Sequence, residues 1–551
     1  MRGSPRSRRS QNPLHDVDEP SLPLTVRPGA HSLQNAGLVR SRWPLHNRTM
    51  STAKTAQDSG SPFMSQRLAV ILSMALASAP VAVRADTPPI PGAPVTPMAE
   101  PFEMKVIASG LAHPHNMVLG PDGQLWLTEL SGRRIVRVDP ATGKLAVLAE
   151  VTDAVHSKDA TGDDKQDGLL GIALHPDLLK GKGRDYVYVS LTYASGEGGE
   201  FPNRTAIRRY SYDAKAGRLV APLDILKGLP SAHDHQSARL LFGPDGKLYY
   251  SIGDQGANQI EYLCRANEAQ ILPTANEVKV GDWQHYKGKI LRLNVDGSIP
   301  ADNASIHGVR SHIYAWGIRN TQGMVFSPDG KLFGTDHGPN ADDELNLILP
   351  GRNYGWPNVS GRKDDAGYSY ANYSAAQGGC AGVKDPSHNG LQVPAGVPVS
   401  KESSWSDPDF VEPLKTFFTV GNDYDYANPV CKDKDLYFIC WPTIAPSSIA
   451  YYKGGKSGVP GWAHSLLITS LKRGLVYRVQ LDPTDSVPVG DAQPILRTLN
   501  RYREIVVSAD GRTLYVATDP VHLGTTSAGN AAFKLDNPGS IIAFKYTAAA
   551  K

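Results

Sequence analysis

A short phrase built around Asp-Gly recurs four times along the chain, and it constrains the fold more than any other feature. It reads GPDGQLWLT at 120–128 and GPDGKLYYS at 243–251, then SPDGKLFGT at 327–335 and SADGRTLYV at 508–516. Asp-Gly between alternating apolar segments is a strong hairpin signal, because glycine accepts the positive φ of a tight turn. The phrase therefore predicts repeated β-hairpins, and it carries no chemistry of its own.

Further strand-like runs lie between these phrases, at 134–138, 186–190, 290–294, 474–479 and 541–545. No long helical period appears, and 53 Gly and 42 Pro with only 20% charged residues suit a turn-rich all-β chain. A hairpin phrase that recurs over a long all-β chain is typical of a β-propeller. We therefore predict an all-β fold, a six-bladed β-propeller with long inserted loops. An array of β-sandwiches is less favoured, because no sandwich-sized repeat boundaries or linkers appear.

The first 85 residues differ from the rest in composition. Residues 1–63 are rich in Arg, Ser and Pro without apolar periodicity, which predicts a disordered leader or an upstream extension from a misassigned start. Residues 64–85 combine a short basic segment, an apolar run and a Val-Arg-Ala end, which predicts a secretory signal peptide. The run is short for a membrane span, and an anchor or a buried strand is the alternative. Residues 86–551 would then form the β-propeller domain.

Export would place the mature protein in the periplasm or outside the cell, if the host is a Gram-negative bacterium, with no membrane span in the mature form. The whole chain has a net charge of +3, but residues 1–85 hold 11 Lys/Arg and 4 Asp/Glu, a net charge of +7. The remaining residues therefore carry a net charge of 3 − 7 = −4. Nothing in this balance indicates a nucleic-acid partner.

Four cysteines are present. Cys431 and Cys440 flank a short segment, and in an exported protein that spacing favours a local disulfide. A zinc site is the weaker interpretation, because no CxxC pair occurs. The sequence leaves the state of Cys264 and Cys380 open.

The densest polar cluster is HDHQ at 233–236, followed by a strand, a turn, a second strand and Asp254. The hairpin should return Asp254 to His235, and a histidine oriented by a carboxylate is the usual design of a general base. A lone histidine is otherwise more often structural. His233 and His235 form an HxH, as do His113 and His115, but further metal ligands are not evident. Solvated or core positions are the better interpretation for His113, His115 and His233.

A second group is cationic: Arg319 beside Asn320, Lys472 beside Arg473, and the alternating pair Arg501 and Arg503. In an extended segment, residues two apart point to one face. Arginine recognises carboxylates through planar paired hydrogen bonds, so such a cluster suits a small polyanionic ligand. Surface charge is the alternative for any one of these residues alone.

A third group is DHGPNADDE at 336–344. Gly338-Pro339 exposes carbonyls in an irregular loop, since proline has no amide hydrogen, and carbonyls near carboxylates suit Ca²⁺. A plain acidic turn fits nearly as well. The acidic stretch 159–168 lacks EF-hand spacing and is interpreted as a loop that carries Gln166.

Longer phrases accompany these clusters: DGLLG at 167–171, DHQS at 234–237, IGDQG at 252–256, GPN at 338–340, NYGWPNV at 353–359, KDD at 363–365, ANYSAA at 371–376, CWPT at 440–443 and NRYR at 500–503. With them the chain resembles the soluble pyrroloquinoline-quinone (PQQ) glucose dehydrogenases of the glucose/sorbosone dehydrogenase family. The resemblance extends from about Phe102 to Lys545 and implies a six-bladed β-propeller.

The resemblance also implies the roles of the site residues. His235 would take the proton of the anomeric hydroxyl while Asp254 orients it, and Arg319 with Ca²⁺ would stabilise charge on the quinone oxygen. Gln166 and Asp234 would position the sugar. The residues implied to hold PQQ, which has three carboxylates, are Asn320, Gln322, Thr443, Lys472, Arg501 and Arg503.

The metal ligands implied by the resemblance form two sets. Gly338 and Pro339 would give carbonyls to the Ca²⁺ that activates PQQ. Ca²⁺ near a homodimer interface would be held by the Asp364 side chain and by carbonyls of Ser360, Arg362 and Glu402. Cys431 and Cys440 match the family's disulfide.

The reaction implied is oxidation of an aldose such as D-glucose at C1 to the aldonolactone, by hydride transfer to PQQ and then to an external electron acceptor. The chain departs from its relatives at Ile318, Thr321, His337 and Phe438, and Cys264 and Cys380 are additional. Two other functions stay open: a metal-dependent propeller lactonase, which would need several carboxylates on one ion, and a non-catalytic sugar-binding propeller. A nicotinamide enzyme is disfavoured, because no strand-GxGxxG-helix unit is present.

Overall fold

The computed structural model describes residues 101–547 except 159–163, 197–201, 385–391, 427–440, 456, 522–523, 526–530 and 533. The chain divides into two compact units, Met1–Ala77 and Ser78–Lys551, and every described residue belongs to the second. The predicted leader and signal peptide, Phe438 and the Cys431–Cys440 pair lie outside the described residues. Within the described ranges, no helix is long and apolar enough to cross a membrane.

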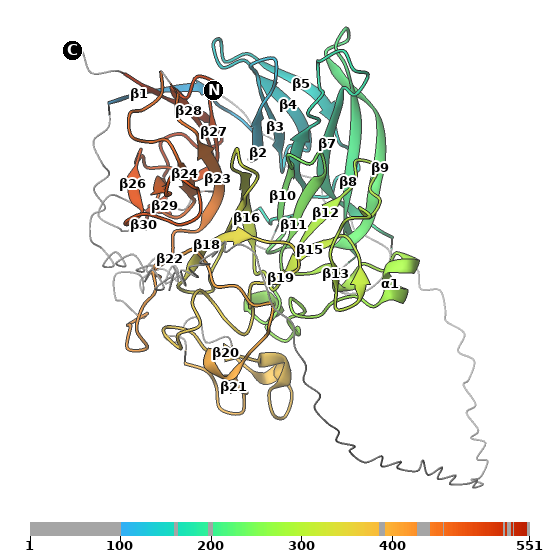
Figure 1. Ribbon diagram of the computed structural model, residues 1–551, viewed down its shortest axis with the longest axis vertical. Helices are drawn as coiled ribbons and strands as arrows, with labels where there is room; N and C mark the ends of the chain where they lie inside the picture. The colour runs from blue at the N-terminus through green and yellow to red at the C-terminus, as the bar shows by residue number, and fades with distance from the viewer. Residues whose placement is uncertain are drawn as a thin grey trace, which may run out of the picture. The chain divides into compact units, whose positions relative to one another are not determined.

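Six sheets of four or five strands dominate this unit (Figure 1). The first three sheets contain, from the innermost strand outward, β2 (Pro114–Leu119), β3 (Leu125–Glu129), β4 (Arg134–Val138) and β5 (Leu145–Glu150); β6 (Leu169–Leu174), β7 (Tyr186–Ala194), β8 (Asn203–Asp213) and β9 (Arg218–Pro230); and β10 (Ser237–Phe242), β11 (Leu248–Ile252), β12 (Lys289–Leu293), β15 (Ile313–Trp316) and β19 (Arg352–Asn353). The other three contain β16 (Thr321–Phe326), β17 (Leu332–Asp336), β18 (Asp343–Ile348) and β22 (Lys415–Phe417); β23 (Pro446–Tyr452), β24 (Ser465–Ser470), β25 (Leu475–Gln480) and β26 (Gln493–Ile495); and β27 (Tyr502–Val507), β28 (Thr513–Thr518), β31 (Ile541–Tyr546) and β1 (Phe102–Ala108).

The innermost strands close a ring. They contact one another in the order β2, β6, β10, β16, β23, β27 and back to β2. The last sheet contains both ends of the described chain, because β1 pairs with β31 in antiparallel register. The sheets are therefore the blades of a six-bladed β-propeller, which confirms the fold predicted from the sequence.

The repeated Asp-Gly phrase has one place in this fold. It forms the turn between the two innermost strands of a blade, in β2–β3, β10–β11, β16–β17 and β27–β28. The glycine of each phrase has a φ between 71° and 90°, which explains why glycine stands there. The other two blades join these strands differently, through 175–185 and 453–464, so the phrase marks four of the six blades. The five further strands predicted from the sequence correspond to β4, β7, β12, β25 and β31.

The apolar cores lie between neighbouring blades. One cluster joins Tyr188 of β7 and Leu240 of β10, and another joins Phe333 of β17 and Ile468 of β24. Burial of apolar surface contributes about 25 cal/mol per Å², so these interfaces hold the ring together.

The centre of the ring is polar instead. Arg239 of β10 donates from Nη1 to Glu504 Oε2 at 2.5 Å and from Nη2 to Oε1 at 2.9 Å, and Glu504 lies in β27. Asn116 of β2 donates to the same carboxylate at 3.1 Å, and Ser448 of β23 is a further donor. Both members of the ion pair are buried. Since β10 and β27 occupy opposite positions in the ring, this pair links strands across the propeller axis.

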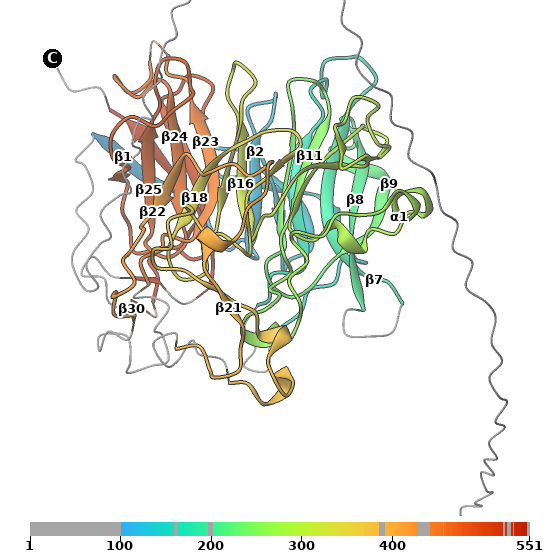
Figure 2. The same ribbon diagram turned by 60° about the horizontal axis from the view of Figure 1, so that its bottom comes forward.

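Short elements lie outside the blades, in the inserted loops. They are α1 (Ala275–Val280), the hairpins β13 (Ser305–Ile306) with β14 (Val309–Arg310), β20 (Tyr370–Ala371) with β21 (Val399–Ser400) and β29 (Gly524–Thr525) with β30 (Ala531–Ala532), and the 3₁₀ turns Ile260–Tyr262, Gln284–Tyr286, Tyr373–Ala375, Cys380–Gly382 and Glu402–Ser404. Figures 1 and 2 both show the segment with β20 and β21 projecting beyond the blade sheets.

Cys264 and Cys380, whose state the sequence left open, form a disulfide with a Cα–Cα distance of 5.4 Å. It joins the loop after β11 to the projecting segment of β20 and β21. Leu263 and Tyr373 pack in an apolar cluster beside it. No free cysteine remains among the described residues.

Candidate active site

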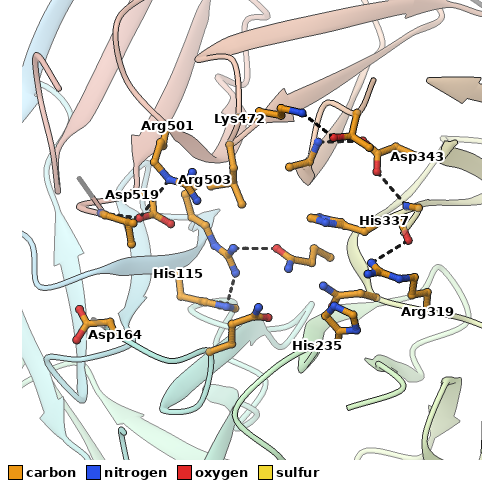
Figure 3. A pocket seen from close by; sticks show the side chains of 18 of the residues that line it. His115, Asp164, His235, Arg319, His337, Asp343, Lys472, Arg501, Arg503 and Asp519 are labelled. Atoms are coloured by element: carbon orange, nitrogen blue, oxygen red, sulfur yellow. Dashed lines mark hydrogen bonds and ion pairs between the residues drawn. The ribbon is translucent and has the colours of Figure 1, made fainter. Parts of the chain in front are cut away.

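A cavity of about 400 Å³ opens where the innermost strands begin (Figure 3). Many of its side chains belong to the first residues of these strands or come just before them, because the blades present these strand ends to one another around the ring. Eleven residues predicted from the sequence line it: Gln166, His235, Arg319, Asn320, Gln322, Gly338, Pro339, Thr443, Lys472, Arg501 and Arg503.

The predicted histidine–carboxylate pair is present. His235 precedes β10 and Asp254 follows β11, and the antiparallel register that sets Ser237 opposite Ile252 brings them together. His235 Nδ1 lies 2.7 Å from Asp254 Oδ1. An ionised carboxylate only accepts hydrogen bonds, so Nδ1 is the donor and Nε2 keeps a lone pair that can take a proton.

The surroundings of Asp254 keep it ionised. Burial alone would raise the pKa of the Asp254 carboxyl, but the charge and hydrogen bond of His235, the charge of Arg319 and the Gly256 amide lower that pKa below its usual value. The strands also approach very closely here, since a Cβ on Gly253 would lie 2.0 Å from the His235 carbonyl oxygen. His235 itself has a φ of 45°, a left-handed conformation that costs about 1–3 kcal/mol and is concentrated at functional sites.

The cavity is strongly cationic beside this pair. Burial lowers the pKa of Lys472 well below its usual value and that of Arg503 to about 10. Arg501 also lines the cavity, so the two alternating arginines do share a face, as predicted. Arg503 Nη1 donates to Gln322 Oε1 at 2.8 Å, but its buried Nε has no hydrogen-bond partner among the described residues. Asp519, 3.8 Å from Arg501 Nε, offsets part of this positive charge, and the arginine and lysine donors that line the cavity suit an anionic ligand.

The carboxylates of the acidic loop 336–344 accept hydrogen bonds from backbone amides and hold the backbone around the cavity in place. Asp336 accepts the amides of Arg319 and Asn320 at 3.0 and 2.5 Å. Asp343 accepts the amide of Gly338 at 2.9 Å, and burial raises the pKa of Asp343 to about 6. These contacts hold Arg319, Asn320 and the Gly338-Pro339 backbone at the cavity wall. The acidic turn is therefore present, and Gly338 and Pro339 of the same loop line the cavity.

The residues predicted for the second metal site also come together. The Glu402 carboxylate accepts the amides of Ser360 at 3.0 Å and Asp364 at 3.2 Å. Burial raises the pKa of Glu402 to about 7. Arg362 lies in the same loop, with Nη1 at 3.4 Å from Glu412. Nowhere in the described part of the chain do three or more His, Cys, Asp or Glu side chains form a group that could hold a metal ion. The sequence prediction relies on backbone carbonyls at both places, with the Asp364 side chain as a further ligand at the second.

The two residues predicted to position the sugar contact each other. Gln166 donates to the Asp234 carboxylate, which also accepts the His235 amide at 2.9 Å. Asp234 Oδ2 lies 3.7 Å from His235 Nε2. Polar groups therefore surround the nitrogen that can act as a base.

Sequence reasoning missed one wall of the cavity. His113 and His115 are buried, as core histidines would be, but both line the cavity. His113 lies 3.4 Å from Asp164 and 3.5 Å from Asp519. The buried positions agree with the interpretation as core histidines, but the sequence did not predict that the two residues line the cavity. The HxH pattern of His113 and His115 was the sequence feature that could have indicated this wall. The acidic partners of His113, however, come from loops far apart in the chain. His233 does stay outside the cavity lining, with Nδ1 at 3.2 Å from Asp167.

Two positions where the chain departs from its relatives have clear environments. Ile318 is buried in an apolar cluster with Tyr249 and Met324. His337 lines the cavity, and burial together with the charge of Arg319 lowers its pKa to about 3, so it is neutral near pH 7.

A second cavity of about 360 Å³ adjoins the first and shares His235, Arg319, Pro339 and Trp441 with it. Six of its other lining residues are aromatic: Trp356, Tyr368, Tyr370, Tyr373, Tyr424 and Tyr426. His235 and Arg319 thus line both cavities. Aromatic rings with a few polar groups are typical of a small-molecule site.

Relatives of known sequence match most of the chain. Residues 111–399 and 424–524 match the model of the glucose/sorbosone dehydrogenase family. Quinoprotein glucose dehydrogenase B of Acinetobacter calcoaceticus is 49% identical over 466 residues, which are 84% of this chain and 95% of that protein. Aldose sugar dehydrogenase YliI of Escherichia coli is 29% identical over 261 residues, 46% of this chain and 61% of that protein.

Solved structures share the fold. The PQQ-bound form of aldose sugar dehydrogenase from Streptomyces coelicolor superposes with a TM-score of 0.52 at 24% identity, covering 82% of this chain and 99% of that chain. A crystal structure of a glucose dehydrogenase gives a TM-score of 0.55 at 24% identity, covering 81% of this chain and all of that chain. From the family match and the close relative, the chain belongs to the glucose/sorbosone dehydrogenase family.

Proposed function

We propose that this protein is a PQQ-dependent aldose dehydrogenase, which oxidises sugars such as D-glucose at C1 to the aldonolactone and passes the electrons to an external acceptor. The observation that supports this most is the His235–Asp254 pair at the wall of a cavity lined by Lys472, Arg501 and Arg503. A base beside a polyanion site is what sugar oxidation by a tricarboxylate quinone requires.

The residues present fit PQQ. Lys472, Arg501 and Arg503 would pair with its carboxylates, and Asn320, Gln322 and Thr443 would donate or accept hydrogen bonds around it. The buried Nε groups of Arg319 and Arg503, which have no partner among the described residues, are donors that such a ligand can satisfy. When bound, PQQ supplies the electrophilic quinone carbon that accepts hydride.

The chain's own residues would prepare the sugar for this step. His235 Nε2 would take the proton from the anomeric hydroxyl, while Asp254 holds the imidazole by its Nδ1–H and stabilises the imidazolium. Gln166 and Asp234 would orient the sugar. Arg319 would place a positive charge where negative charge grows, which lowers the energy of the transition state.

Calcium would be held by the carbonyls of Gly338 and Pro339, whose loop is fixed by Asp343. The second set, Ser360, Arg362, Asp364 and Glu402, would bind further Ca²⁺ near a homodimer interface. A lactonase is less well supported, because the described residues contain no group of carboxylates that could share an ion. Export, with the protein acting in the periplasm or outside the cell, belongs to the same proposal, as does the Cys431–Cys440 disulfide.

The test is dye-linked glucose oxidation by the purified protein after addition of PQQ and Ca²⁺, with each omitted in turn and with a chelator control. We expect activity only when both are present, and bleaching of the bound quinone on addition of sugar. Binding of PQQ without turnover of any aldose would point to another alcohol substrate. A protein that binds no PQQ would contradict the proposal.

Replacement of Arg501 should weaken the cofactor site. In Arg501→Ala we expect PQQ to bind about 10- to 100-fold more weakly, because a hydrogen bond to a charged group contributes about 1.5–3 kcal/mol. Titration of PQQ followed by its absorbance measures this. Arg512→Ala is the matched control, since Arg512 belongs to the same blade but donates its Nε to the Tyr546 carbonyl. Equal affinities of the two variants would remove Arg501 from the cofactor site.

A further inference from the structure

The second oxygen of the Asp254 carboxylate has its own pair of donors. Oδ1 receives His235 Nδ1 at 2.7 Å and the Gly256 amide at 2.9 Å. Oδ2 accepts hydrogen bonds from the indole Nε1–H of Trp356 at 2.7 Å and from the side-chain amide of Asn267 at 3.0 Å. An ionised carboxylate accepts about four hydrogen bonds, so these donors saturate it and fix its plane. The plane of Asp254 in turn sets the direction of the His235 ring.

Trp356 is itself held in place on both sides. It comes from the loop after β19, 102 residues from Asp254 in sequence. Its amide donates to the Gly317 carbonyl at 3.0 Å, and its carbonyl accepts the Gln270 side chain at 2.7 Å. The side-chain amides of Gln270 and Asn353 pair with each other at 3.0 and 2.8 Å. The segments that carry Trp356 and Asn267 are therefore joined into one support behind Asp254.

The ring of Trp356 also contacts the arginine of the site. The guanidinium carbon of Arg319 lies 5.4 Å from the ring centroid, and Tyr368 packs against the ring with centroids 5.9 Å apart. A cation over an indole face is attracted by its quadrupole. Trp356 is buried, with 8% of its surface exposed, so its ring is held tightly by these neighbours.

We propose that Trp356 is a positioning residue, whose indole N–H fixes the Asp254–His235 pair while its ring supports Arg319. An indole N–H can only donate, so it matches an acceptor that stays ionised. One side chain would thus set the mutual placement of the base and the cation. The role in turnover rests on the proposed function.

The first test is Trp356→Phe, which keeps an aromatic ring beside Arg319 and removes the donor to Asp254. We expect kcat for glucose to fall about 10- to 100-fold, the range found when partners that orient an active-site ligand are removed. KM and PQQ affinity should change little. The isotope effect with C1-deuterated glucose should rise, because the slower chemical step then limits turnover. A residue with a merely structural role would not change the isotope effect.

Trp462→Phe is the matched control. Trp462 is buried and lies 5.4 Å from the guanidinium carbon of Arg478, but it belongs to a core cluster away from both cavities. Its variant should keep kcat and the isotope effect of the parent protein. In an Asp254→Asn background, Trp356→Phe should lower kcat further by less than about threefold, since the two residues act as a unit. Additive losses, or equal kcat in the two tryptophan variants, would overturn the proposal.

Two further measurements decide the case if Trp356→Phe folds poorly or the parent protein oxidises no sugar. Asn267→Ala removes the other donor to Asp254 Oδ2 from a different segment, and it should lower kcat in the same way. In the cofactor-free protein labelled with ¹⁵N-histidine, the Nδ1–H proton of His235, identified by its loss in His235→Gln, should shift in Trp356→Phe or Asn267→Ala. It should stay unchanged in Trp462→Phe. An unshifted proton in both site variants would sink the positioning role independently of the reaction.

Discussion

His235→Gln should lower kcat for glucose about 10³-fold, within the range of general acid–base catalysis, and leave PQQ bound. Glutamine can still hydrogen-bond to Asp254, but it cannot take a proton at neutral pH. The cationic residues that would hold PQQ are separate side chains, so the cofactor site should be intact. Dye-linked turnover, measured beside a PQQ titration of the same preparation, gives both quantities.

His233→Gln is the matched control for this variant. His233 is two residues away, its side chain is 32% exposed, and its Nδ1 faces Asp167. It does not line the cavity, so its variant should turn over like the parent protein. If His235→Gln retained near-normal turnover, or if both variants lost activity equally, His235 could not be the base.

Glu504→Gln should lower the free energy of unfolding by about 3–5 kcal/mol, the range for breaking a buried ion pair. The substitution leaves the buried Arg239 charge without its partner. It also disturbs the hydrogen bonds that Asn116 and Ser448 make to the carboxylate from two other strands. Unfolding of the purified protein in guanidinium measures the change. The slope of the unfolding free energy against denaturant concentration is compared between variants, to check that the unfolding transition stays the same.

A surface pair provides the comparison. Arg292 holds Asp302 through two hydrogen bonds of 2.9 and 2.8 Å, but the Asp302 side chain is 68% exposed. Asp302→Asn should therefore have little effect on the free energy of unfolding. The double variant Arg239→Met/Glu504→Leu should recover much of the loss of Glu504→Gln, because no unpaired charge then remains buried. A small effect of Glu504→Gln, equal to that of Asp302→Asn, would contradict the buried-charge argument.

Local sequence patterns predicted the fold, the His235–Asp254 pair and the cationic residues of the cavity, whereas Gln322 and Thr443 were implied only by the family resemblance. The Asp-Gly phrase determines a turn within a few residues, so it marked the hairpins of four blades. His235 and Asp254 are joined by one such hairpin, and Arg501 comes directly before β27, in which Arg503 lies, so local chain geometry brought each pair together. Both pairings follow from patterns that act over a few residues: the hairpin turn and the alternation of side chains in an extended segment.

The remaining site features depend on loops that meet only in three dimensions. Trp356 reaches Asp254 from the loop after β19, 102 residues later in the sequence, and Cys264 meets Cys380 across a sequence separation of 116 residues. His113 lies between Asp164 and Asp519, which belong to loops at opposite ends of the chain. No local pattern reports such contacts, because the partners are far apart in sequence, and those of His113 meet only through the closure of the ring.

That closure has a consequence for the order of events during synthesis. The lining of the first cavity extends in sequence from His113 to Val521, and the blade that completes the ring needs β31 as well as β1. A growing chain at the ribosome, or one still being threaded through a channel, therefore has no assembled cofactor site. PQQ must be captured by the finished protein, in whichever compartment the C-terminal strand docks, and the supply of quinone in that compartment would set how much active enzyme accumulates.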